Sequence, residues 1–285
     1  MAELSLVYLA RLASGLPAME AFVESYRRHP AGIDHDLLVV YKGFTAPSDD
    51  WRRLLIGLTH DEFHVPDHGF DVGSYIAASR QLRTRYICFL NSFSEVLAPN
   101  WLGILFDHAG RSGVGAVGAT GSWESFFTNY EVETRPANSG SGFRRWPRRA
   151  LRAWRLSRYR SDFLPAPNPH LRSNAFVIER NRWLSLNVGM LRSKEDLWKF
   201  ESGRASMTRQ LLFHGLDVLV VGRDGMAYTK DQWSESSTFR SGNQQNLLVA
   251  DNRTREYDRA DDAFKQRLAQ FAWGDRPAAT AELDR

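Results

Sequence analysis

The sequence predicts an α/β protein with one mixed, mostly parallel sheet flanked by helices. Short apolar runs alternate with amphipathic helical segments over residues 4–119, which is typical of a doubly wound sheet. The run 86–90 is apolar throughout, as expected for a strand buried on both faces. A second such run, 113–119, follows one helical segment later, and both runs end in polar or small residues. Ligands gather at the carboxyl ends of parallel strands, so 91–95 is the first candidate for chemistry.

The remaining elements are predicted in chain order from the same patterns. Helix 17–26 is indicated by Met19, Phe22, Val23 and Tyr26, which recur at helical spacing. Strands are expected at 4–9, 35–41, 63–66, 86–90, 113–119, 171–178 and 216–221, and helices at 17–26, 48–55, 76–82, 101–106, 147–156, 207–214 and 258–271. Residues 129–142 lose periodicity and are expected to form a loop.

Composition places the chain among ordinary globular proteins. Its 285 residues are 43% hydrophobic and 25% charged, enough for a sizeable core. Cys88, the one cysteine, lies inside an apolar run and is expected to fill the core. The N-terminus lacks the basic start of a secretory signal, and no apolar run approaches the roughly 20 residues of a membrane span. We expect a cytoplasmic protein, with attachment to a membrane surface as a further option.

The stretch 84–124 carries a family resemblance. Its pattern of apolar strand, Leu-Asn-x-x-x-Glu-Val, Pro, Trp-Leu, helix and Val-Gly-Ala-Val-Gly resembles the centre of family-2-type glycosyltransferases of the GT-A fold. The resemblance implies that a nucleotide-sugar donor binds at Asn91, Ser92, Phe93 and Ser94. In that family an Asp-x-Asp or Asn-x-Asp motif holds a divalent metal, but Phe93 stands where the metal-binding Asp would fall. Mn²⁺ or Mg²⁺ is therefore a candidate cofactor that the sequence does not require, and we assign no metal ligand.

Further donor contacts follow from the same resemblance. The ends of the first two strands, which would hold the base, are Ala10 with Arg11 and Lys42, so the family's base-binding Asp is missing. The segment 67–75 is similar to the Gly-x-Asp-x-Gly variant of rhamnan-synthesis-type transferases. Its glycines, including Gly73, allow close backbone approach, and Asp71 can accept from ribose or sugar hydroxyls. The alternative is that Asp71 only caps the following helix.

A second group of candidates lies on the predicted strand 171–178 and just before it. His170, Arg172 and Asn174 alternate, so they would share one face. The Arg172 fork matches phosphate oxygens and would assist the diphosphate when no metal is available. His170 and Asn174 would contact the acceptor. The alternative is the polar outer face of an edge strand.

Trp123 and Glu124 follow the end of the strand 113–119. Trp123 would stack on a sugar of the acceptor or on a base, and Glu124 would accept from hydroxyls. A core tryptophan at the end of a strand is an equally good interpretation of Trp123.

Glu201 is the predicted catalytic residue. The order of carboxylate, helix with Arg209, Gly215 and β-run resembles the family's segment in which an acidic residue deprotonates the acceptor hydroxyl. One base opposite the leaving diphosphate suffices for inversion at the anomeric carbon. The alternative is that Glu201 caps a helix starting at Gly203. Glu195 and Asp196 are substitutes for the role, although they resemble acids at a helix start.

The segment 143–160 is a basic insertion with eight arginines and two tryptophans. Such a helix suits an anionic membrane surface, and the same composition suits nucleic acid or a solvated helix face. No nucleic-acid-binding module accompanies it, so we expect no nucleic-acid partner. Residues 229–285 form an extension with a polar, aromatic arm expected to fold over the site and a terminal helix; the domain itself spans 1–228.

The sequence thus predicts transfer of a sugar from a nucleotide-sugar to a glycan or lipid-linked acceptor, with Glu201 as base and with inversion. The alternative is a catalytically inactive relative that binds glycans or partners, because Phe93 and Lys42 replace two family acids.

Overall fold

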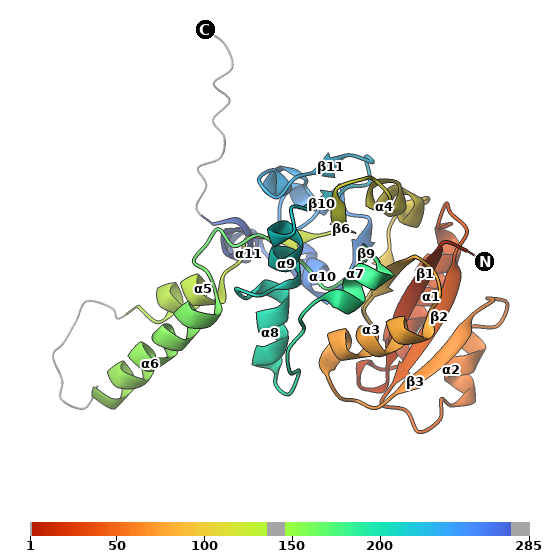
Figure 1. Ribbon diagram of the computed structural model, residues 1–285, viewed down its shortest axis with the longest axis horizontal. Coiled ribbons are helices and arrows are strands. Elements are labelled where there is room, and N and C mark those ends of the chain that lie inside the picture. Colours follow the sequence, from red (N-terminus) through yellow and green to blue (C-terminus); the bar gives the residue numbers. More distant parts are fainter. Residues whose placement is uncertain (1, 136–145, 275–285) are drawn as a thin grey trace, which may run out of the picture.

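The computed structural model describes residues 2–135 and 146–274 (Figure 1). Its centre is an eight-stranded sheet of order β11-β10-β6-β9-β4-β1-β2-β3. The first four strands in the chain that enter this sheet pair in parallel: β1 (Leu4–Arg11), β2 (Asp36–Lys42), β3 (Asp61–Val65) and β4 (Tyr86–Leu90). Every residue of β4 is buried, as its unbroken apolar run predicts. The predicted mixed, mostly parallel α/β sheet is confirmed.

The other half of the sheet contains the antiparallel strands. Strand β9 (Phe176–Glu179) lies between β4 and β6 (Val114–Gly118) and is antiparallel to both. Strand β10 (Asp217–Val221) is parallel to β6, and the edge strand β11 (Ala227–Tyr228) is antiparallel to β10. β9 is thus a central strand of the sheet, between β4 and β6.

The predicted continuous strand 171–178 is wrong. Strand β8 (His170–Leu171) pairs instead with β7 (Gly121–Ser122), and the chain bends before β9 starts. Ala175, with φ 51°, has the left-handed conformation that ends an extended run. The bend presents the side chains of 172–174 at the carboxyl end of β4.

Helices cover both faces of the sheet (Figure 1). On one face, Phe22 and Trp101 pack in the core cluster beneath α1 (Leu16–Arg28), α2 (Asp49–Leu54) and α4 (Trp101–Ala109). On the other, Tyr75 and Trp183 pack beneath α3 (Phe70–Gln81), α7 (Arg180–Ser185), α8 (Lys194–Ser202) and α9 (Met207–Phe213). The two clusters fill the space between the sheet and the helices on its two faces. A ligand can therefore reach the sheet only at the ends of its strands.

Helices α5 (Phe126–Glu133) and α6 (Trp146–Asp162) form a helical pair that extends from the body of the domain (Figure 1). The helix α5 occupies the start of the predicted loop 129–142 because Ser125 caps it and Phe126 packs on Phe163, ring centroids 5.2 Å apart. Residues 143–145 of the predicted basic insertion lie outside the described residues. No helix among residues 2–135 and 146–274 has the length and apolar character needed to cross a bilayer.

The C-terminal extension contributes to a separate two-stranded sheet. Strand β12 (Val249–Ala250) pairs with β5 (Glu95–Val96), directly after the polar segment that follows β4. The predicted single helix 258–271 is two helices, α10 (Asn252–Arg259) and α11 (Asp262–Trp273), because Ala260 leaves the helical conformation and Asp261 caps a new helix. Short 3-10 turns lie at Leu12–Ser14, Trp233–Glu235 and Gly242–Gln244. Residues 275–285 lie outside the described residues.

Candidate active site

A cavity of about 350 Å³ lies at the carboxyl end of β4, bounded by α8 and by the C-terminal extension. This volume is within the range of small-molecule sites. Six of the site residues predicted from the sequence line this cavity: Asn91, Glu124, His170, Arg172, Asn174 and Glu201. The extension supplies seven more: Phe239, Arg240, Asp251, Arg253, Glu256, Leu268 and Phe271. The expectation that the arm folds over the site is thus met by Phe239 and Arg240.

Glu201 lies in the last turn of α8, its side chain directed to Ser173, whose hydroxyl donates a hydrogen bond to its Oε1. Burial raises the pKa of Glu201 to about 7; the charge of Asp71 adds to this, whereas Ser173 and Arg172 act to lower it. A carboxyl group with this pKa can take up and release a proton near neutral pH. The geometry therefore suits a general base.

The alternatives for Glu201 do not hold in the structure. Helix α9 begins at Met207 and its N-cap is Ser206, so Glu201 caps no following helix. The acids at the start of α8 have local roles. Asp196 forms a capping box with Ser193, and Glu195 pairs with Arg158 at 3.0 Å.

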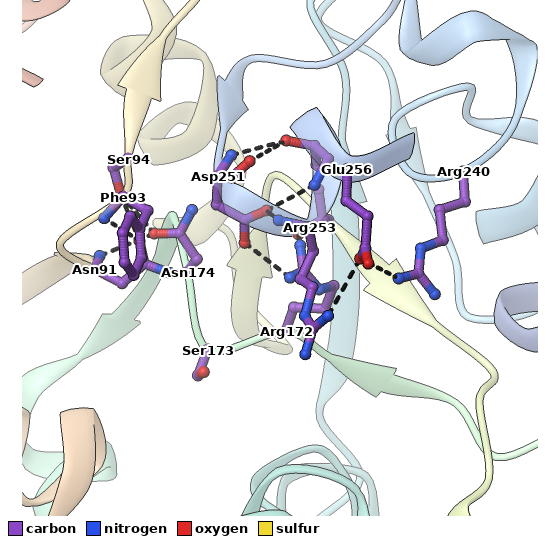
Figure 2. Close-up of polar contacts among 12 residues, drawn as sticks. Asn91, Phe93, Ser94, Arg172, Ser173, Asn174, Arg240, Asp251, Arg253 and Glu256 are labelled. Atoms are coloured by element: carbon purple, nitrogen blue, oxygen red, sulfur yellow. Dashed lines mark hydrogen bonds and ion pairs between the residues drawn. The ribbon is translucent and has the colours of Figure 1, made fainter. Parts of the chain in front are cut away.

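The edge after β4 is a closed network of hydrogen bonds (Figure 2). Asn174 Oδ1 accepts from the Asn91 backbone N–H at 2.9 Å and from the Ser94 hydroxyl at 2.7 Å. Asn91 Oδ1 accepts from the Phe93 backbone N–H at 2.9 Å. Ser92 is buried, and its carbonyl accepts from the Tyr8 hydroxyl. Of this segment, only Asn91 lines the cavity.

This edge does not fit a divalent metal. Its side-chain oxygens are amide and hydroxyl groups already bonded to the protein, and Phe93 offers no ligand where the family has a carboxylate. In the part of the chain that the structure describes, no group of three or more His, Cys, Asp or Glu side chains is placed to hold a metal ion. We therefore derive no chemistry through a metal.

Arg172 is held by the extension. Its Nη2 donates to Asp251 Oδ2 at 2.7 Å (Figure 2). Its guanidinium lies over the Phe239 ring, 4.4 Å from the ring centroid. Burial acts to raise the pKa of Asp251, but Arg172 and the N–H groups of Thr254 and Arg253 outweigh it, so the pKa is lowered. Asp251 is thus an ionised counter-ion, which fixes Arg172 and offsets part of its charge.

The far side of the cavity carries a second charged group (Figure 2). Arg240 Nη2 is 3.6 Å from Glu256 Oε2, and Arg240 Nη1 is 3.9 Å from Glu124 Oε2. Glu124 accepts a hydrogen bond from Asn129 at 2.8 Å, and burial raises its pKa. Four carboxyl groups (Glu124, Glu201, Asp251, Glu256) and four cations (Arg172, Lys194, Arg240, Arg253) line the cavity, so its side-chain charge is balanced when all four carboxyl groups are ionised and becomes positive when Glu201 takes up a proton.

His170 is a neutral cavity residue. Its Nδ1 lies 2.9 Å from the Asn168 carbonyl and donates to it, which leaves Nε2 as an acceptor. Burial lowers the pKa of His170 to about 4. It can contact a hydroxyl and is a poor proton acceptor at neutral pH.

The remaining predicted donor residues form a separate group beside α3. Arg11 donates twice to Asp67, both at 3.0 Å, and buried Lys42 donates to the carbonyls of His68 and Phe70. The Lys42 amine therefore holds this loop, which goes against its predicted contact with the donor. Ala10, next to Arg11, has almost no exposed surface.

Asp71 lies inside the first turn of α3, whose N-cap is Gly69 with φ 69°, so the alternative that Asp71 caps this helix is wrong. Burial raises its pKa. Its charge acts on Glu201, which places it near the cavity although it does not line it. Gly73 is also helical, and its backbone N–H bonds to the Gly69 carbonyl.

Trp123 belongs to the core. It is 3% exposed, its ring meets Trp273 edge-on at 5.3 Å, and its indole N–H donates to the Lys230 carbonyl. This placement goes against the predicted stacking on a sugar or base and fits the alternative interpretation.

No family model matches the sequence, and no curated protein sequence matches it. Similar solved structures include a mannosyltransferase from Pyrobaculum calidifontis in complex with GDP-Man and Mn²⁺ (12% identity, TM-score 0.37, 63% of this chain and 45% of that one). Another is mouse xyloside xylosyltransferase 1 in its apo form (12% identity, TM-score 0.38, 64% of this chain and 68% of that one). The chain thus spans less than half of the mannosyltransferase.

Proposed function

We propose that the protein is an inverting glycosyltransferase that moves a sugar from a nucleotide-sugar to a glycan or lipid-linked acceptor. The observation that carries the proposal is Glu201: a half-buried side chain whose carboxyl group accepts a hydrogen bond from Ser173, in one cavity with Asn91 and Arg172 at the carboxyl end of β4. This is the edge at which an open α/β sheet binds its ligands.

In the proposed reaction, ionised Glu201 accepts the proton of an acceptor hydroxyl. The acceptor oxygen forms a bond to the anomeric carbon while the bond from that carbon to the donor's diphosphate oxygen breaks. Arg172 stabilises the charge that develops on the leaving diphosphate, and Asp251 keeps its guanidinium in place. Because the base and the leaving group lie on opposite sides of the carbon, the configuration inverts.

The donor would extend from Asn91 toward Arg11, with Asp71 accepting from its sugar or ribose hydroxyls. The backbone N–H groups of Phe93 and Gly73 are already bonded within the protein, and Ser92, Ser94 and Lys42 hold the neighbouring backbone, so these five residues would shape the donor site without hydrogen bonds of these groups to the donor. Glu124, His170 and Asn174 are assigned to the acceptor side.

The test is binding followed by turnover. Thermal unfolding is recorded with a panel of nucleoside diphosphates, with and without a chelator. We expect one nucleotide to raise the Tm, unaffected by the chelator. Glu201→Gln should keep this nucleotide binding and lose transfer by about 10²-fold or more, whereas the matched variant Glu195→Gln, in the same helix, should keep both.

Other outcomes have defined meanings. Nucleotide binding without transfer to any acceptor, in the wild type as in Glu201→Gln, or no response to any nucleotide, would favour the inactive glycan- or partner-binding protein. Phe93 and the engaged Lys42 amine are the observations that favour that second candidate.

Helix α6 supports a further part of the proposal, attachment to an anionic membrane surface. Leu151 and Trp154 are 50% and 57% exposed, and Arg155 is exposed beside them. Arg158 lies over the Trp154 ring at 5.6 Å. Exposed aromatic and arginine side chains on one helix suit the headgroup region.

The test is co-sedimentation with phosphatidylglycerol and phosphatidylcholine vesicles. We expect binding to the anionic vesicles that falls with salt and with Trp154→Glu. Phe213→Glu, at another exposed aromatic in α9, serves as the control. Equal binding to both vesicle types would exclude the attachment.

A further inference from the structure

Arg240 is a buried cation that faces the candidate cavity. It lies on the arm of the extension, its side chain is 7% exposed, and its guanidinium lies over the Phe239 ring at 4.9 Å. Its backbone N–H donates to the Gln244 side chain, whose amide in turn donates to Asp258 on α10 at 2.7 Å. The arm is thus fixed to the body of the extension, and the position of Arg240 is fixed with it.

The guanidinium of Arg240 has hydrogen-bond donors that the described residues do not use. The nearest carboxylate oxygens, on Glu256 and Glu124, lie 3.6 and 3.9 Å away, beyond hydrogen-bond distance. Its buried Nε has no hydrogen-bond partner within residues 2–135 and 146–274. The other two cavity arginines differ: Arg172 donates to Asp251 at 2.7 Å, and Arg253 donates to Glu256 at 3.2 Å.

A buried guanidinium whose hydrogen-bond donors lack partners is costly, and the oxygens of a bound anion would supply those partners. The planar fork of arginine matches the two oxygens of a carboxylate or phosphate. The carboxylates near Arg240 have other partners: Glu256 accepts from Arg253, and Glu124 accepts from Asn129. Of the three cavity arginines, Arg240 therefore has the most hydrogen-bonding capacity left for an oxyanion; the fourth cation, Lys194, is exposed to solvent.

The position of Arg240 separates it from the donor edge. In Figure 2, Asn91 and Ser94 lie on one side of Arg172, and Arg240 lies on the other, with Glu256. A donor diphosphate at Asn91 and Arg172 would leave the Arg240 end to the acceptor. This step rests on the proposed function.

We infer that Arg240 binds an anionic group of the acceptor, either the carboxylate of an acidic sugar or the phosphate of a phosphorylated or lipid-linked one. Phe239 and Phe271 flank this end of the cavity and would pack against the ring that carries the group.

The test is equilibrium binding to the full-length protein without a donor, so it does not depend on turnover. The probes are D-glucuronate and D-glucose, which differ only by the carboxylate, together with D-glucose 6-phosphate. We expect at least one anionic probe to bind about tenfold or more tightly than glucose, the effect of one charge-assisted pair. Which anion binds more tightly identifies the source of the group. Arg240→Gln should remove the preference, and Arg267→Gln, at a 58% exposed arginine of the same extension, should keep it.

A substitute variant and a nucleotide-binding control complete the test. If Arg240→Gln does not fold, as judged by circular dichroism, Glu256→Gln is used instead, since removing the carboxylate nearest to Arg240 should strengthen binding of the anions relative to glucose. Nucleoside diphosphate binding should be the same in the wild type and in Arg240→Gln. Equal affinity for all three sugars, no binding of either anion up to about 20 mM, or loss of nucleotide binding in Arg240→Gln would overturn the assignment.

Discussion

Replacement of Glu201 by Gln should change how the stability of the protein depends on pH. Burial holds the pKa of this carboxyl group at about 7 in the folded protein, against 4.5 for an ordinary glutamate. The folded state therefore binds the proton more tightly than the unfolded state. The resulting stabilisation is fully present below pH 4.5 and is lost as the pH rises through 7. The difference of about 2.5 pKa units corresponds to about 3 kcal/mol, at 1.36 kcal/mol per unit.

Glutamine keeps an oxygen that can accept from Ser173 and carries no charge. The free energy of unfolding of Glu201→Gln relative to the wild type should thus rise by about 3 kcal/mol between pH 4.5 and pH 8. Urea denaturation at both pH values measures it, and comparison of the two proteins cancels the titration of all other groups that the substitution leaves unchanged. A difference that stays constant within about 0.5 kcal/mol would refute the buried, proton-binding carboxyl group. The carboxylate role of Glu201 would fail with it.

Three other perturbations test neighbouring parts of the structure. Ser173→Ala removes the hydrogen bond that favours ionised Glu201, so the pH midpoint of kcat/KM for transfer should move upward; an unchanged midpoint would separate the two residues. Asp251→Asn keeps the cap of α10 but leaves Arg172 without its counter-ion, and urea denaturation should show a loss of about 3 kcal/mol. Gly121→Ala places a Cβ 2.6 Å from the Trp233 ring and 2.9 Å from Val220, which should lower the free energy of unfolding by about 1–3 kcal/mol. An unchanged free energy of unfolding would show that Trp233 and Val220 can move to accept the methyl group.

Local patterns were enough to predict most of the sheet. Strands such as β1, β4 and β6 are apolar runs between breakers, and each is recognisable without its partners. The same reasoning failed at 171–178, where an alternating pattern indicates one strand. The bend at Ala175 allows β9 to pair with both β4 and β6. That pairing is a tertiary contact, which a local sequence pattern does not contain.

The candidate site was predictable in part for a similar reason. Glu201 and Arg172 could be selected from the sequence as site residues because each lies next to a helix or strand that the sequence identifies. Asp251, which fixes Arg172, lies 79 residues further along the chain. It is not among the residues predicted from the sequence, and in the structure it also caps α10 by accepting from the Thr254 backbone N–H. Its ion pair with Arg172 depends on the pairing of β12 with β5, and no local sequence pattern predicts that pairing.

The central place of β9 has a consequence for synthesis of the chain. The neighbours of β6 in the sheet are β9 and β10, and both come later in the sequence. During translation, the parallel group β3-β2-β1-β4 can pair as soon as residue 90 has emerged. Strand β6 must then wait, unpaired, until residues 176–179 arrive to join the two halves. A ribosome that stalls within that interval would expose two apolar strand edges to aggregation.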